Sequence, residues 1–184
     1  MNSVPSTWLA ELKVLAPPPP EPRYGSGDWA AVASRLGAEL PSDYVELVKD
    51  YGVGQFDKFI VLLSPFCPGE FHNLLVALSD LHDATQYTIA DGTPGFPYTP
   101  FQDKRGLLPF AWTANDDWMF WQSESDDPES WTTRIFSNRS GTYEDFPMGA
   151  TALLCKLFSR EVKTTMFPDD FPSMPRSKVK FEQF

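Results

Sequence analysis

Residues 40–66 have the sequence LPSDYVELVKDYGVGQFDKFIVLLSPF, which contains the signals of an amphipathic helix followed by a strand. Ser42 stands at the start of the helical pattern, where its hydroxyl can accept a hydrogen bond from an amide of the first turn. Apolar side chains then recur at helical spacing at Tyr44, Leu47, Val48 and Tyr51. Gly52 follows, at the position where a helix commonly closes with a left-handed residue. We therefore expect one helix here with a single buried face.

A β-prone segment follows this helix directly. Phe56–Leu63 contains the run FIVLL at residues 59–63, and Ser64-Pro65 ends it. Gly54 lies between the helix and this segment, where the freedom of a glycine allows the chain to reverse. The whole unit predicts an amphipathic helix that packs on a β-sheet.

The second half of the chain predicts short antiparallel strands. Leu107–Trp112 and Asp117–Gln122 flank a turn at residues 114–116. Alternation in the second segment puts Trp118 on one face of the sheet and Trp121 on the other. Trp131–Phe136 alternates in the same way after an acidic connection at residues 124–129. The short connections between these segments favour antiparallel pairing.

Four further segments have helical periodicity: Ser6–Leu15, Trp29–Leu36, Glu70–Ile89 and a last helix opened by Phe146-Pro147. The tetraproline Pro17–Pro20 must end the first of them, because proline lacks the amide hydrogen that a helix needs. Asp28 is a good N-cap for the second, and Gly37 ends it. Turn-forming residues between Asp91 and Gly106 predict a long irregular loop.

The charge of the chain restricts its partners. The 184 residues carry a formal net charge of −10. Such a protein repels nucleic acid and anionic membranes, so neither is expected as a partner, whereas a partner with a basic surface is favoured. The same charge would also keep a protein soluble without any partner.

No segment predicts export or membrane insertion. Glu11 and Lys13 interrupt the apolar N-terminal residues, and no run reaches the roughly eighteen apolar residues of a membrane-spanning helix. The two cysteines, Cys67 and Cys155, are too few for a disulfide framework and belong to no C-x-x-C pair. We expect free, partly buried thiols and a cytoplasmic protein.

The order of several short motifs resembles the SUKH superfamily, which includes the yeast cell-wall-assembly regulator and many bacterial immunity proteins. The first half contains LPSDY, then YG.G.F, then a strand and PF. The second half contains LLPFAWTANDDWMFWQ, DPESW and FPMGATALLCKLF in that order. The resemblance covers roughly Trp29–Glu161. It implies a non-enzymatic α+β binding domain, in bacteria typically one that neutralises a partner toxin.

These observations predict a single α+β domain, with one mostly antiparallel β-sheet and helices packed on one face. We place this SUKH-like domain at residues 24–163. Residues 1–23 form an N-terminal arm with a short helix and a polyproline linker, and residues 164–184 form a Phe- and Pro-rich C-terminal tail. The phenylalanines favour a tail that wraps over the domain, because exposing several of them would promote aggregation.

The candidate partner-binding site is the acidic and aromatic β unit that begins at Asp116. It comprises Asp116, Asp117, Trp118, Trp121, Glu124, Asp126, Asp127 and Trp131. A sheet covered by helices on one side leaves its other face free, and tryptophan is a common interface anchor. The carboxylates would steer a basic partner towards that face. Alternatively, Trp118 or Trp131 belongs to the core and the acids are solvated hairpin tips.

The sequence contains no catalytic motif. It lacks G-x-S-x-G, a phosphate-binding glycine loop and H-E-x-x-H, and the acidic loop SESDDPES lacks the glycine and ligand spacing of a calcium loop. His72 and His82, ten residues apart on one predicted helix, do not form a metal site. We therefore predict a non-enzymatic protein without a cofactor or a metal.

The predicted activity is stoichiometric binding, most specifically the inhibition of a cognate toxin domain whose active or substrate-binding surface the protein would cover. Two other functions stay open. The segment Pro17–Pro20 could serve a regulatory adaptor, because polyproline segments bind aromatic grooves. Exposed tryptophans could instead stack on sugars in a carbohydrate-binding module.

Overall fold

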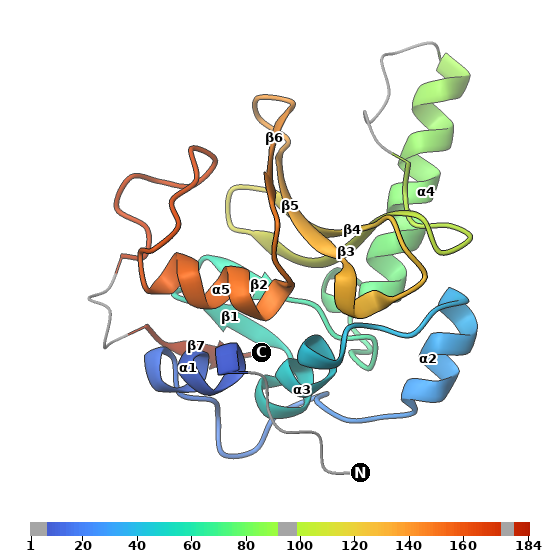
Figure 1. The fold of residues 1–184 in the computed structure, drawn as a ribbon. Coiled ribbons are helices and arrows are strands. Elements are labelled where there is room, and N and C mark those ends of the chain that lie inside the picture. The colour runs from blue at the N-terminus through green and yellow to red at the C-terminus, as the bar shows by residue number, and fades with distance from the viewer. Residues whose placement is uncertain (1–6, 92–98, 174–178) are drawn as a thin grey trace.

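One antiparallel sheet of seven strands organises residues 7–91, 99–173 and 179–184, the parts of the chain that the computed structural model describes (Figure 1). The strands are β1 (Gly54–Phe56), β2 (Ile60–Leu62), β3 (Gly106–Thr113), β4 (Trp118–Ser123), β5 (Thr132–Ser137), β6 (Thr142–Phe146) and β7 (Phe181–Gln183). Their order in the sheet is β6-β5-β4-β3-β2-β1-β7. The predicted α+β class with an antiparallel sheet is confirmed.

Helices lie on both faces of this sheet. The α-helices are α1 (Thr7–Leu15), α2 (Trp29–Leu36), α3 (Ser42–Tyr51), α4 (Leu74–Asp91) and α5 (Ala150–Phe158), and two 3-10 helices are η1 (Glu70–His72) and η2 (Pro128–Ser130). Helices α1, α3 and α5 pack together over the main core (Figure 1). Helix α4 packs on the opposite face, where Leu81 joins a small cluster with side chains of β3, β4 and β5. The second face of the sheet is therefore only partly free.

Alternation along β4 follows the prediction and assigns its tryptophans to different faces. Trp121 is fully buried on the face that carries α3, and its ring centroid lies 4.7 Å from that of Tyr44 in an edge-on contact. Trp118 faces the other way, beside Phe120 and the α4 cluster. Tyr44 and Trp121 thus form an aromatic contact between helix α3 and strand β4.

The helix ends agree with the sequence signals at α2 and differ at α3. Asp28 caps α2 by accepting a hydrogen bond from Ala31 N at 3.0 Å, and Gly37 closes it with φ 74°. Ser42, predicted as the N-cap of α3, is instead its first residue, and its backbone N and its hydroxyl donate to the Glu129 carboxylate at 2.7 and 3.0 Å. A carboxylate suits this position because the amides at a helix N-terminus carry a partial positive charge.

Two strand assignments from the sequence need correction. The predicted single strand Phe56–Leu63 is a hairpin, because Asp57 and Lys58 adopt φ values of 52° and 56° and turn the chain between β1 and β2. Strand β6 was not predicted, since its first residues are polar and exposed and give no apolar alternation. It pairs with β5 along its whole length.

The helix predicted over Glu70–Ile89 is divided near its start. Asn73 accepts hydrogen bonds from Leu75 N at 2.8 Å and Val76 N at 3.2 Å, so α4 begins only at Leu74. The preceding residues form η1, which the extended backbone of Asn73 separates from α4. Part of the loop predicted between Asp91 and Gly106 falls on residues 92–98, which lie outside the described residues.

Both chain ends add to the main core. Leu9 and Leu12 of α1 are buried, and the Tyr51 hydroxyl donates to Ala16 O at 2.6 Å. In the C-terminal tail, Phe167 is buried and β7 pairs with β1, as expected for a tail that wraps over the domain. Gly54 permits this pairing, because a Cβ at that position would lie 2.3 Å from Glu182 O.

Two other sequence predictions concern the thiols and the membrane. Cys67 and Cys155 form no disulfide, as expected, and both are buried where partial burial was predicted. None of the helices in the described ranges has the length and apolar character needed to span a bilayer.

Candidate functional site

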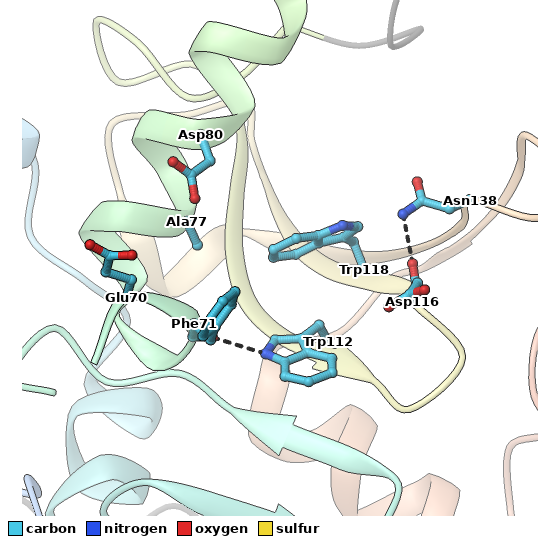
Figure 2. Close-up of a pocket in the computed structure, with 8 residues that line it drawn as sticks. All are labelled: Glu70, Phe71, Ala77, Asp80, Trp112, Asp116, Trp118 and Asn138. Atoms are coloured by element: carbon cyan, nitrogen blue, oxygen red, sulfur yellow. Dashed lines mark hydrogen bonds between the residues drawn. The ribbon is translucent and has the colours of Figure 1, made fainter. Parts of the chain in front are cut away.

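A groove opens on the second face of the sheet, between α4 and the hairpin of β3 and β4. It has a volume of about 350 Å³, at the lower end of the range of ligand pockets. Its walls are Glu70, Phe71, Ala77, Asp80, Trp112, Asp116, Trp118 and Asn138. Figure 2 shows Trp118 between Asp80 of α4 on one side and Asp116 with Asn138 on the other.

The register of the hairpin delivers both indoles to the groove. Trp112 on β3 and Trp118 on β4 are directly paired across the strands, so their side chains project from the same face. Asp116 completes the turn between them with φ 62°. Asn138 holds that turn from the β5–β6 connection, because its side-chain amide donates to Asp116 O at 2.7 Å.

The 3-10 helix η1 supplies the most exposed aromatic side chain of the groove. Phe71 is 80% exposed, which is exceptional for a phenylalanine, and its backbone carbonyl accepts a hydrogen bond from the Trp112 indole N at 3.2 Å. His72 stacks on the C-terminal Phe184 with ring centroids 4.5 Å apart. Partial burial lowers the pKa of His72 below its ordinary value of 6.5, so the ring is mainly neutral at pH 7.

All charged residues that line the groove are acidic. Glu70, Asp80 and Asp116 are exposed, and no Lys or Arg lines the groove. Within the described ranges, none of the ion pairs formed by Lys or Arg involves these three carboxylates. The groove therefore combines three aromatic side chains with three carboxylates that form no ion pair with a Lys or Arg of the described residues.

Three residues of the predicted site are buried instead of exposed. Trp121 has no exposed surface, and Trp131 is 3% exposed with its indole N donating to Ser125 O at 3.0 Å. Asp117 is 2% exposed and accepts a hydrogen bond from the Thr113 hydroxyl at 3.0 Å. Burial raises the pKa of the Asp117 carboxyl. A contact role requires an accessible side chain, so these three residues are not part of the groove.

Three other predicted residues lie at the opposite end of β4. Asp126 forms an ion pair with Arg105 at 2.8 Å, and this hydrogen bond lowers the pKa of the Asp126 carboxyl. Asp127 caps η2 by accepting a hydrogen bond from Glu129 N at 3.1 Å. Glu124 is exposed and lines a separate hollow with Arg105. Of the eight predicted residues, only Asp116 and Trp118 reach the groove.

Sequence reasoning missed Glu70, Phe71, Asp80, Trp112 and Asn138. The register of a hairpin centred on residues 114–116 would have paired Trp112 with Trp118 and placed both on one face. Asn73 is a recognisable N-cap, and taking it as the start of α4 would have freed Phe71 from the apolar stripe of the helix. Asp80 and Asn138 gave no comparable signal, because they approach the groove only through the tertiary fold.

In the part of the chain that the structure describes, no three His, Cys, Asp or Glu side chains come together in a way that could hold a metal ion. The chemistry offered by the groove is thus stacking, apolar contact and interaction with positive charge.

Comparison with known proteins places the chain in a family. Searches of curated proteins and of solved structures found no match to this chain. A family model described as SUKH_6, SMI1-KNR4 cell-wall, matches residues 26–152, which is more than half of the chain. The match covers α2, α3, the strands β1–β6 and the start of α5, and therefore every residue that lines the groove. The chain belongs to the SUKH family.

Proposed function

We propose that this protein is a non-catalytic binding protein of the immunity type, which neutralises a cognate toxin domain in the cytoplasm by covering the toxin's active or substrate-binding surface. Membership of the SUKH family supports this proposal, because the family includes toxin-immunity proteins. The observation that carries it is the groove, in which an 80% exposed Phe71 stands beside two indoles. A group of accessible aromatic side chains in one groove supports an interaction surface.

The groove has the physical features of the centre of a protein interface. Phe71, Trp112 and Trp118 are large side chains with few rotatable bonds, so a partner can bury much apolar area at a small cost in conformational entropy. The carboxylates Glu70, Asp80 and Asp116 would attract a basic surface over a distance and increase the rate of association. The toxin is then inhibited by occlusion, without any chemical step.

A survival assay tests this function. The protein is co-expressed with the toxin domain encoded beside it, and we expect cells to survive only when it is present. Phe71→Ala should abolish or strongly reduce protection while the variant protein stays folded. The side chain is exposed and the hydrogen bond from Trp112 goes to the backbone, so its removal should change the free energy of unfolding by no more than about 0.5 kcal/mol.

The matched control is Tyr87→Ala. Tyr87 is 71% exposed on α4 and does not line the groove. This variant should protect as well as the unmodified protein does. Undiminished toxicity in the presence of the unmodified protein would refute immunity for that pair, and full protection by Phe71→Ala would remove the groove from the interface.

A carbohydrate-binding function is the second candidate that a specific observation favours. Trp112 and Trp118 line one groove together, and paired indoles can stack on sugar rings. A glycan array decides between the two, because a carbohydrate-binding module would retain sugars that Trp118→Phe releases. An immunity protein would retain none.

A further inference from the structure

We propose that the groove is a seat for an arginine side chain of the bound protein, with the guanidinium group against the Trp118 indole and between the carboxylates of Asp80 and Asp116. This inference rests on the proposed function and specifies the chemistry of the partner at the same site. It goes beyond a generally basic partner surface, because it names one side chain and the residues that would hold it.

The shape and charge of the groove favour a planar cation. Trp118 lies between Asp80 and Asp116, so a group placed against its ring has an acidic side chain on either side (Figure 2). A cation gains from an aromatic face and from carboxylates at the same time, since both present negative potential. His72, next to this groove, does not offset that potential at pH 7 because its ring is mainly neutral.

The molecule already contains one occupied example of this arrangement. On the same face of the sheet, the guanidinium carbon of Arg134 lies 4.0 Å from the ring centroid of Tyr143. The same guanidinium donates two hydrogen bonds to the Asp145 carboxylate, at 2.5 and 2.8 Å. Arg134 on β5 is directly paired with Phe120 on β4, two residues from Trp118, so both sites belong to one surface.

The comparison with Arg134 identifies what the groove lacks. At Arg134 an aromatic ring and a carboxylate are joined by an internal guanidinium. In the groove the ring and the carboxylates are present, and among the described residues no internal Lys or Arg forms an ion pair with them. A guanidinium from outside would complete the same set of contacts.

Arginine fits this site better than lysine for geometric reasons. A guanidinium is planar and can stack on an indole while its edge donates several hydrogen bonds, whereas an ammonium group is a compact point charge. Asp80 and Asp116 lie on either side of Trp118 in Figure 2, so a cation between them needs donors that point in different directions, which the five N–H groups of arginine provide.

Nuclear magnetic resonance of the tryptophan indole N–H groups tests the seat directly. The probe is a short glycine peptide that carries one arginine, compared with the same peptide carrying lysine or citrulline. Citrulline has the planar shape of arginine without its charge. The indole signals of Trp112 and Trp118 are assigned from Trp112→Phe and Trp118→Phe, and the buried Trp121 and Trp131 serve as internal references.

We expect the arginine peptide to shift the Trp112 and Trp118 signals selectively. Its dissociation constant should be roughly tenfold lower than that of the citrulline peptide, because hydrogen bonds to charged groups discriminate by about that factor. The lysine peptide should bind with an intermediate dissociation constant. Equal shifts with arginine and citrulline, or no selective shift at Trp118, would overturn the arginine seat.

Charge-removing variants complete the test. Asp80→Asn combined with Asp116→Asn should raise the dissociation constant of the arginine peptide about tenfold, and asparagine keeps the left-handed backbone that Asp116 adopts. Glu124→Gln removes one negative charge, half of what the double variant removes, from an exposed side chain outside the groove and should leave binding unchanged. Weakening in proportion to the charge removed, whether inside or outside the groove, would show attraction by net charge alone and would overturn the seat.

The survival assay separates this inference from the proposed function. A protein that protects cells but does not bind the arginine peptide selectively would overturn the seat and leave the immunity function standing. A protein that binds the peptide but does not protect would overturn immunity for that toxin and leave the seat standing. Loss of peptide binding in the Asp80→Asn, Asp116→Asn protein with full protection would show that the toxin does not use the seat.

Discussion

The two ends of strand β4 both carry acidic residues, but the structure uses them differently. At the end formed by residues 124–129, carboxylates bind other groups of the same protein. Asp126 pairs with Arg105, and Glu129 accepts two hydrogen bonds at the start of α3. At the other end, Asp80 and Asp116 stand beside exposed aromatic rings without such a cationic partner in the described ranges. Acidic composition alone does not distinguish these two situations.

This difference separates stability from binding. A carboxylate that satisfies a helix N-terminus contributes to folding, because its removal leaves amides without an acceptor. A carboxylate that faces only solvent contributes little to folding and remains available to a partner. Substitution of Glu129, the acceptor at the start of α3, should therefore affect unfolding, and substitutions in the groove should affect binding.

The largest contrast is expected between two aromatic residues. Trp121→Ala should lower the free energy of unfolding by about 3–5 kcal/mol, because it empties a fully buried site in the main core. Phe71→Ala should change it by no more than about 0.5 kcal/mol. Urea denaturation monitored by circular dichroism measures both. A loss of several kcal/mol in Phe71→Ala would mean that Phe71 holds the fold and is not free for a partner.

A smaller effect is expected at the start of α3. Glu129→Ala removes the acceptor of the Ser42 amide and hydroxyl and should lower the free energy of unfolding by about 1 kcal/mol. Glu124→Ala, a change of the same charge in an exposed side chain, should have an effect within about 0.5 kcal/mol. Equal urea midpoints for the two variants would show that Glu129 does not stabilise the helix.

The fold was predictable to the extent that it depends on local signals. The buried face of α3 follows directly from the helical spacing between Tyr44 and Tyr51, and alternation placed Trp118 and Trp121 on opposite faces. Sequence signals failed where the structure depends on contacts between distant residues. The acceptor at the start of α3 is Glu129, 87 positions away, and no pattern near Ser42 indicates it.

The site was less predictable for the same reason. Alternation states that Trp118 and Trp121 face opposite ways, but not which of the two faces is buried. The exposure of Trp118 depends on α4, which covers only part of the second face of the sheet. Trp118 packs against the cluster under α4 and also lines the groove beside it. The groove also needs Asp80 and Asn138, whose positions are fixed by the packing of α4 and by the β5–β6 connection.

The pH dependence of stability should distinguish the buried Asp117 from the exposed Asp126. Burial raises the pKa of Asp117 above its ordinary value of 3.8, so the folded state holds this proton at pH values where the unfolded state has lost it. Stability from this group is therefore present below pH 3.8 and is lost as the pH rises from 3.8 through the raised pKa. Asp117→Asn should remove that decline.

Urea denaturation of both proteins over a series of pH values measures this effect. The difference in the free energy of unfolding between the original protein and Asp117→Asn should fall across the window above pH 3.8 and stay constant at higher pH. Titration by nuclear magnetic resonance should give Asp126 a pKa shift in the opposite direction, below 3.8, because Arg105 lowers the pKa of this carboxyl. A pKa of Asp117 at or below 3.8 would mean that hydrogen bonds to its carboxylate, such as that from the Thr113 hydroxyl, outweigh the effect of burial.

The smallest effect is expected when the Asp126–Arg105 ion pair is removed. The two side chains are 71% and 52% exposed, so water and salt screen their attraction and both keep much of their freedom. Asp126→Asn should leave the urea midpoint unchanged within error, and a double-mutant cycle with Arg105→Gln should show no coupling beyond that error. A clear loss of stability would mean that this exposed pair fixes the β4–β5 connection. The ion pair would then stabilise the fold as Glu129 does. Asp80 and Asp116 of the groove would be left as the carboxylates available to a partner.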